Sequence, residues 1–156
     1  MLTLILMRHS NASSYGISDI ERHLTGPGVA NASLAAAELA RSGNTIEAVV
    51  HSTAVRAAET AQIVANQLGI TAVSANPVLY EGATTQDYID AAGSTGKRCV
   101  LIVAHNPEIS SSASMLLAED LRIGFLPANF VVMDFDCDSW NDVSAHSGRL
   151  TYSRLY

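Results

Sequence analysis

Three apolar runs in this chain each end in side chains that bind anions or carry protons. The residues at these ends are Arg8 and His9, then His51 and Ser52 with Arg56 one helical turn further on, and finally His105 with Asn106 and Pro107. A guanidinium group is planar, permanently charged and able to bind two oxygens at once. An imidazole changes its protonation near neutral pH, so it can act as a nucleophile or move a proton. If the three runs are neighbouring parallel strands, the sequence predicts one anion pocket that contains two histidines.

The elements that must position these residues alternate along the chain. Short apolar runs predict strands at 2–7, 46–50, 71–74, 98–104, 129–136 and 148–156. Caps, stops and helical spacing predict helices from Thr25 to near Gly43, from Ser52 to Gly69, over 84–92, and from Asn106 to about Glu119. This alternation favours a layered α/β domain with a largely parallel sheet and an antiparallel pair at one edge. In such sheets, ligands bind beyond the carboxyl ends of the strands.

Length and composition favour one domain over residues 1–156. The chain has 48% hydrophobic and 15% charged residues, which suits a single cored domain. Its net charge is −6 and its basic residues are scattered, so we expect no nucleic-acid partner. Cys99 and Cys137 lack metal-ligand spacing, and the first apolar run is too short for a leader or a membrane span. We therefore expect a cytoplasmic protein with no membrane association, and no feature predicts an oligomeric state.

Each residue of the predicted pocket also has an ordinary explanation when taken singly. Arg8 and Arg56 fit exposed charges, His9 fits a structural histidine, and Ser52 fits a helix N-cap. Three such coincidences at matching positions in the topology are much less expected than one. The remaining histidines are assigned to surface or capping positions; they are His23, His51 and His146.

Four segments of the chain, in order from residue 3 to about residue 118, resemble the histidine phosphatase superfamily, also called the phosphoglycerate-mutase-like family. They are MRHSNAS, ERHLTGPG, HSTAVRAAETA and VLIVAHNP. The similarity is strongest to the short SixA-type phosphohistidine phosphatases. The resemblance implies a three-layer domain in which helices flank a mostly parallel central sheet. One position departs from the family signature Arg-His-Gly, because Ser10 stands in place of the glycine, where a small residue lets the backbone approach a phosphate.

The resemblance also implies a role for each pocket residue. His9 would be the nucleophile that accepts the phosphoryl group, and His105 would donate to that group in the transition state. Arg8 and Arg56 would clamp the phosphate oxygens, and Arg22 would be an additional phosphate-binding arginine. These residue types suit the chemistry, because phosphoryl transfer depends on in-line positioning and on stabilising the charge of the equatorial oxygens. The implied reaction needs no metal ion and no cofactor.

The leaving group determines whether a general acid is needed. An alkoxide leaving a phosphoester requires a positioned acid, whereas the imidazole of phosphohistidine departs as a neutral base. Glu81, in the segment VLYEG, matches the position of an acidic glutamate in phosphoester-cleaving relatives, and it is equally well explained as a loop carboxylate beside a turn glycine. Asp19 and Glu21 are weaker candidates for this acid.

The preferred interpretation is a metal-independent phosphatase that acts on protein phosphohistidine or on a small phosphorylated molecule. The segments 11–24 and 81–97 are expected to form the rim of its site, and their few charges favour an open rim suited to a protein substrate. One alternative is a non-catalytic module that recognises a phosphorylated partner. A metallohydrolase with His9 and His105 as ligands is disfavoured, because no further ligand pattern accompanies them. A mutase is disfavoured by the short chain.

Overall fold

A six-stranded sheet with the order β3-β2-β4-β1-β5-β6 forms the centre of the computed structural model, which describes residues 1–15 and 18–155. The strands are β1 (Leu2–Arg8), β2 (Ala48–His51), β3 (Val73–Ala75), β4 (Cys99–Ala104), β5 (Phe130–Phe135) and β6 (Arg149–Arg154). The first four strands of this order are parallel, and β5 and β6 complete the sheet in antiparallel pairing. The mostly parallel sheet with an antiparallel edge is the arrangement expected from the sequence. The predicted end of the last strand, residue 156, lies outside the described residues.

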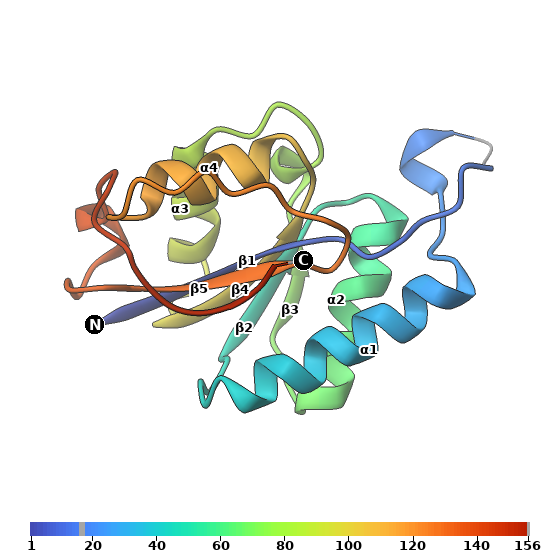
Figure 1. Cartoon of the computed structure of the whole chain (residues 1–156), viewed down its shortest axis with the longest axis horizontal. Helices are drawn as coiled ribbons and strands as arrows, with labels where there is room; N and C mark the ends of the chain where they lie inside the picture. Colours follow the sequence, from blue (N-terminus) through green and yellow to red (C-terminus); the bar gives the residue numbers. More distant parts are fainter. Residues whose placement is uncertain (16–17, 156) are drawn as a thin grey trace.

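Four helices cover the two faces of the sheet and make a three-layer α/β fold (Figure 1). The helices α1 (Gly26–Arg41) and α2 (Val55–Leu68) pack on one face, and α3 (Thr85–Gly93) and α4 (Glu108–Leu116) pack on the other. Three 3-10 segments complete the description; they are η1 (Asp19–Glu21), η2 (Pro77–Leu79) and η3 (Trp140–Asp142).

The apolar run of β1 is continuous because this strand is covered on both faces. Successive side chains of a strand point to opposite faces. Leu4 and Leu6 accordingly pack in the core beneath α3 and α4, whereas Ile5 and Met7 pack in the core beneath α1 and α2. All four side chains are 0% exposed, so the run serves two hydrophobic cores at once.

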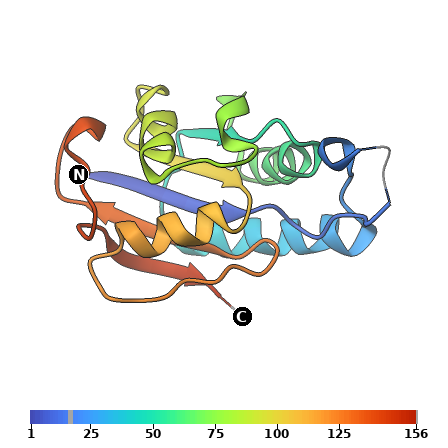
Figure 2. The same ribbon diagram turned by 90° about the horizontal axis from the view of Figure 1, so that it is seen from above.

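The register of the sheet brings the carboxyl ends of β1, β2 and β4 to the same level. Arg8 pairs with Ala104, and His51 pairs with Val103. Figure 2 shows β1 between β4 and β5, with the segment that contains η1 beyond the carboxyl end of β1. Side chains that follow these strands therefore meet at one edge of the sheet, as the sequence predicts.

Two helix starts differ from the sequence prediction. The prediction that Ser52 is the N-cap of α2 is wrong, because α2 begins at Val55 and its N-cap is Ala54. The prediction that Asn106 caps a helix running to about residue 119 is also wrong, since the N-cap of α4 is Pro107 and α4 ends at Leu116. The Oγ of Ser52 bonds to the His105 ring as well as to the backbone N–H of Ala54, and the Asn106 side chain bonds to the backbone oxygen of Phe125 and to the Ser110 hydroxyl.

Other local predictions are confirmed. Thr25 caps α1, since its Oγ1 accepts a hydrogen bond from the backbone N–H of Gly28 at 3.0 Å. Gly69 ends α2 with a φ of 71°, in the left-handed region that glycine adopts without a Cβ clash. In the described part of the chain, no helix has the length and apolar character needed to cross a membrane. Cys99 and Cys137 are free thiols.

The first turn of α1 packs tightly against the segment that follows β1, and this contact generates a prediction. A Cβ atom on Gly28 would lie 2.0 Å from the backbone oxygen of Asn11, whereas a Cβ atom on Gly26 meets nothing within 4 Å. We expect Gly28→Ala to lower the free energy of unfolding by about 1–3 kcal/mol, the usual cost of overpacking. Chemical denaturation measures this change. Gly26→Ala is the matched control and should change stability by less than about 1 kcal/mol; equal stability of the two variants would contradict the prediction.

Candidate active site

A cavity of about 470 Å³ lies at the carboxyl ends of β1 and β4. All six residues predicted for the site line it; they are Arg8, His9, Arg22, Arg56, Glu81 and His105. None of His23, His51 and His146 lines it. The described part of the predicted rim 11–24 contributes four lining residues, whereas the predicted rim 81–97 contributes Glu81. Residues 16 and 17 of the first rim segment lie outside the described residues.

His9 follows β1 and is held with one ring nitrogen turned toward the main chain. Its Nδ1 lies 2.7 Å from the backbone oxygen of Ser10, and the side chain is buried. A carbonyl oxygen accepts hydrogen bonds, so Nδ1 carries the proton and the lone pair of the neutral ring is on Nε2. Burial lowers the pKa of His9 to about 3, and the nearby positive charges of Arg56 and Arg8 act in the same direction. The ring is therefore neutral at physiological pH.

His105 follows β4, and its ring lies beside the ring of His9. The two centroids are 5.1 Å apart, at an interplanar angle of 55°. The Nε2 atom lies 2.7 Å from the Oγ of Ser52, whose oxygen also accepts from the backbone N–H of Ala54. The serine hydroxyl can donate to Nε2, which leaves the proton of a neutral His105 on Nδ1. That nitrogen is buried with no hydrogen-bond partner among the described residues, and burial, followed by the charge of Arg56, lowers the pKa of His105 to about 4.

Each of the three arginines is anchored by a backbone carbonyl. The Nη1 atoms donate to three different oxygens: Arg8 to Phe125 at 3.0 Å, Arg22 to Ser13 at 2.9 Å, and Arg56 to Asp19 at 2.7 Å. A neutral carbonyl orients a guanidinium group without cancelling its charge. The Nε–H groups of Arg8 and Arg56 are buried and have no hydrogen-bond partner in the described part of the chain, so the fold leaves both donors unsatisfied.

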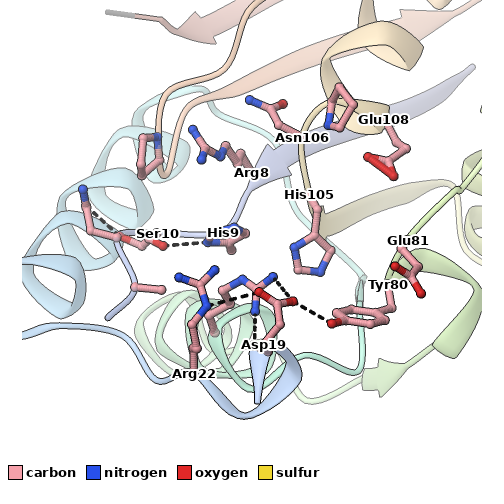
Figure 3. A pocket seen from close by; sticks show the side chains of 15 residues that line it. Arg8, His9, Ser10, Asp19, Arg22, Tyr80, Glu81, His105, Asn106 and Glu108 are labelled. Atoms are coloured by element: carbon pink, nitrogen blue, oxygen red, sulfur yellow. Dashed lines mark hydrogen bonds and ion pairs between the residues drawn. The ribbon is translucent and has the colours of Figure 1, made fainter. Parts of the chain in front are cut away.

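Asp19 and Tyr80 belong to the same cluster (Figure 3). The Oδ2 of Asp19 accepts from the Tyr80 hydroxyl at 2.6 Å and from Nη2 of Arg56 at 3.1 Å. The hydrogen bond from Tyr80, supported by Arg56, lowers the pKa of Asp19 to about 2. Asp19 is ionised at neutral pH, so it is unsuited to donate a proton there. The sequence contains no periodic or spacing signal that would have linked Tyr80 to this cluster.

Two further carboxylates lie at the rim. Glu81 is exposed and makes no hydrogen bond or ion pair with another described residue, and Figure 3 places it on the side of Tyr80 away from His9. Glu108 accepts a hydrogen bond at its Oε2 from the backbone N–H of Gly82 at 2.8 Å. Glu21, the other weaker acid candidate, bonds to Ser18 and does not line the cavity. Among the described residues, no three His, Cys, Asp or Glu side chains are grouped so that they could hold a metal ion.

Ser10 is fully buried, and its polar groups bond within the fold. Its hydroxyl donates to the backbone oxygen of Gly28 at 2.7 Å, and its backbone N–H donates to Thr60 Oγ1 at 3.0 Å. The hydroxyl therefore joins the segment after β1 to the first turn of α1.

Comparison with known proteins finds one family profile that matches about half of the chain and solved structures of the same fold that cover nearly all of it. The sequence profile of the histidine phosphatase superfamily (branch 1) matches residues 4–86. A search of curated proteins found no match. Among solved structures, the protein histidine phosphatase SixA in complex with tungstate has a TM-score of 0.83 at 22% identity, covering 99% of this chain and 97% of its own. A protein from Nakamurella multipartitia assigned as the phosphohistidine phosphatase SixA has a TM-score of 0.83 at 26% identity, with coverage of 98% and 95%.

A solved structure with lower sequence identity has the same fold. Phosphoserine phosphatase from Entamoeba histolytica, in complex with 3-phosphoglyceric acid, has a TM-score of 0.71 at 16% identity, covering 100% of this chain and 98% of its own. The observed architecture is thus the phosphoglycerate-mutase-like fold expected from the sequence.

The lowered pKa values of the two pocket histidines generate a prediction. His9 and His105 should stay neutral when the pH falls to about 5, where an ordinary histidine is mostly protonated. The imidazole signals of ¹⁵N-labelled protein, assigned with His9→Asn and His105→Asn variants, report this protonation. Titration of either ring between about pH 6 and 7 would contradict the prediction.

Proposed function

Because this chain belongs to the histidine phosphatase superfamily (branch 1) and is a phosphatase of that superfamily, we propose that it works through a phosphohistidine intermediate on His9, without a metal ion. The proposed substrate is phosphohistidine on a protein or a small phosphorylated compound. One observation carries the proposal: two neutral imidazoles whose centres are 5.1 Å apart line one cavity with three arginines. We assign the whole of residues 1–156 to one histidine phosphatase domain.

In the first step, the lone pair on Nε2 of His9 attacks phosphorus. The bond to the leaving group breaks, and the leaving atom takes the electron pair. The Nδ1–H of His9 keeps its hydrogen bond to the oxygen of Ser10, 2.7 Å away, which offsets the positive charge that forms on the ring. In the second step, water attacks phosphorus, the bond to Nε2 breaks, and the electron pair returns to His9 while the water proton passes to phosphate.

The arginines supply the charge that stabilises the phosphoryl group in both steps. Arg8, Arg22 and Arg56 bind its equatorial oxygens through the donors that their carbonyl anchors leave available. We assign Nδ1 of His105 as the donor to the phosphoryl group, with the Ser52 hydroxyl donating to Nε2, 2.7 Å away. With this set of donors, charge stabilisation needs no divalent ion.

Phosphohistidine is the favoured substrate class because its leaving group needs no positioned acid. Asp19, the carboxylate that contacts the arginines, has a lowered pKa and is ionised, so it has no proton to donate. Glu81 lies at the rim of the cavity. Solvent can protonate the substrate imidazole on the nitrogen that does not carry phosphorus before the P–N bond breaks. The imidazole then leaves as a neutral molecule. Two structural relatives carry the name of a phosphohistidine phosphatase, which supports the same substrate class.

The intermediate generates a direct prediction. Wild-type protein mixed briefly with ³²P-phosphoramidate should form a phosphoenzyme that survives base and is lost in acid, because that is the behaviour of a phosphorus–nitrogen bond. His9→Ala should abolish the label, since the ring that forms the bond is missing. Quenched gel autoradiography measures it. The matched control is His23→Ala, an exposed histidine outside the cavity, which should label as wild type does. A phosphoenzyme in His9→Ala would disprove the assignment.

A second prediction concerns the leaving group. We propose that Glu81 donates the proton when the substrate is a phosphoester. Glu81→Gln should then lower kcat/KM for phenyl phosphate by about 100-fold or more, the usual contribution of a general acid, and change that for phosphoramidate by less than about twofold. Glu108→Gln, at the same rim, is the matched control and should leave this ratio unchanged. An equal loss on both substrates would refute the role of Glu81.

A further inference from the structure

The carboxylate of Asp19 forms ion pairs with two of the three arginines in the cavity. Its Oδ2 accepts from Nη2 of Arg56 at 3.1 Å, and its Oδ1 lies 3.3 Å from Nε of Arg22. The side chain of Arg56 is 7% exposed and that of Asp19 is 57% exposed, so the carboxylate meets the buried guanidinium from the open side of the site. Figure 3 shows Asp19 between Arg22 and Tyr80, facing the histidines.

Asp19 keeps its negative charge at physiological pH, so this charge always contributes to the electrostatics of the cavity. The Tyr80 hydroxyl donates to its Oδ2 at 2.6 Å, and that bond, together with Arg56, keeps the pKa of Asp19 at about 2. Asp19 therefore carries its negative charge at every pH at which the two histidines are neutral. A phosphate in the cavity meets this charge at close range, and it shares the same guanidinium groups with it.

From these contacts we propose that the carboxylate of Asp19 competes with phosphate for the donors of Arg56 and Arg22. This competition weakens the binding of phosphate and speeds the release of the product. The proposal rests on the proposed function, in which phosphate binds in this cavity. Three arginines around one dianion bind it tightly, because their hydrogen bonds to it are charge-assisted. Inorganic phosphate is the product of every turnover, so tight binding of phosphate would slow its release. A fixed anion that uses the same donors makes the binding free energy of phosphate less favourable, and each loss of about 1.4 kcal/mol raises the Kd tenfold.

The carboxylate is not needed to hold Arg56 in place. The backbone oxygen of Asp19 accepts from Nη1 of Arg56 at 2.7 Å, and Arg22 is anchored separately by the backbone oxygen of Ser13. Variants of the Asp19 side chain keep both main-chain anchors. A change of charge at Asp19 can therefore be tested while the arginines remain positioned, and competition and positioning predict opposite results.

The experiment is isothermal titration of inorganic phosphate into the full chain at low ionic strength. We expect Asp19→Asn to lower the Kd for phosphate by about tenfold, since a partly solvated like-charge contact has been removed. Asp19→Ala should change the Kd in the same direction. The gain should shrink as salt is raised to about 0.5 M, because salt screens charges near solvent.

Glu21→Gln is the matched control, since it removes the same charge from the same 3-10 segment at an exposed residue outside the cavity. Its Kd should equal that of wild type within about twofold, because the Glu21 carboxylate is exposed, bonds to Ser18 and makes no ion pair with Arg22 or Arg56. Unchanged or weaker phosphate binding in Asp19→Asn and Asp19→Ala, with wild type still binding, would overturn the competitor role. Failure of wild type to bind phosphate would instead count against the proposed function.

Discussion

The site depends on keeping two imidazoles neutral beside three guanidinium groups. Burial disfavours the charged form of His9 and His105, and the positive charges of Arg56 and Arg8 act in the same direction. Burial is the largest cause of the lowered pKa of His9, and the nearby arginines add to it, so both oppose the protonation that would remove the lone pair of this ring. In the proposed mechanism, the arginines therefore contribute both to substrate binding and, together with burial, to keeping the nucleophile unprotonated. The hydrogen bond to the oxygen of Ser10 then places that lone pair on Nε2.

Main-chain carbonyl oxygens position the arginines of this arrangement. The backbone oxygen of Phe125 accepts from Nη1 of Arg8 and from Nδ2 of Asn106, so one carbonyl joins the end of β1 to the end of β4. Phe125 is itself fixed, because its N–H donates to Ser110 Oγ on α4. A charged partner in the same position would cancel part of the potential that an anion needs. The carbonyl anchors therefore orient the arginines without opposing their charge, whereas the carboxylate of Asp19, which contacts Arg56 and Arg22, does oppose it.

The strands and the pocket were predictable from the sequence because their signals are local. A continuous apolar run predicts a strand buried on both faces, and the rule that ligands bind at carboxyl ends brings Arg8, His9 and His105 together. The roles of Ser52 and Asn106 were not predictable. Both residue types are common helix caps, and sequence spacing reports contacts within a few residues. Ser52 instead bonds to His105, 53 positions away, and the contact of Tyr80 with Asp19 spans 61 positions.

The serine that replaces the family glycine shows how such a departure is accommodated. Ser10 brings a Cβ and a hydroxyl to a position beside the proposed nucleophile, and the hydroxyl turns to the backbone oxygen of Gly28, 2.7 Å away. Gly28 in turn has no space for a side chain, because the backbone oxygen of Asn11 occupies the place of its Cβ. The close approach of α1 thus gives the extra hydroxyl an acceptor inside the fold. The hydroxyl proton and the backbone N–H of Ser10 are thus both engaged within the fold, so in the proposed mechanism the arginines and His105 remain the donors to the phosphoryl oxygens.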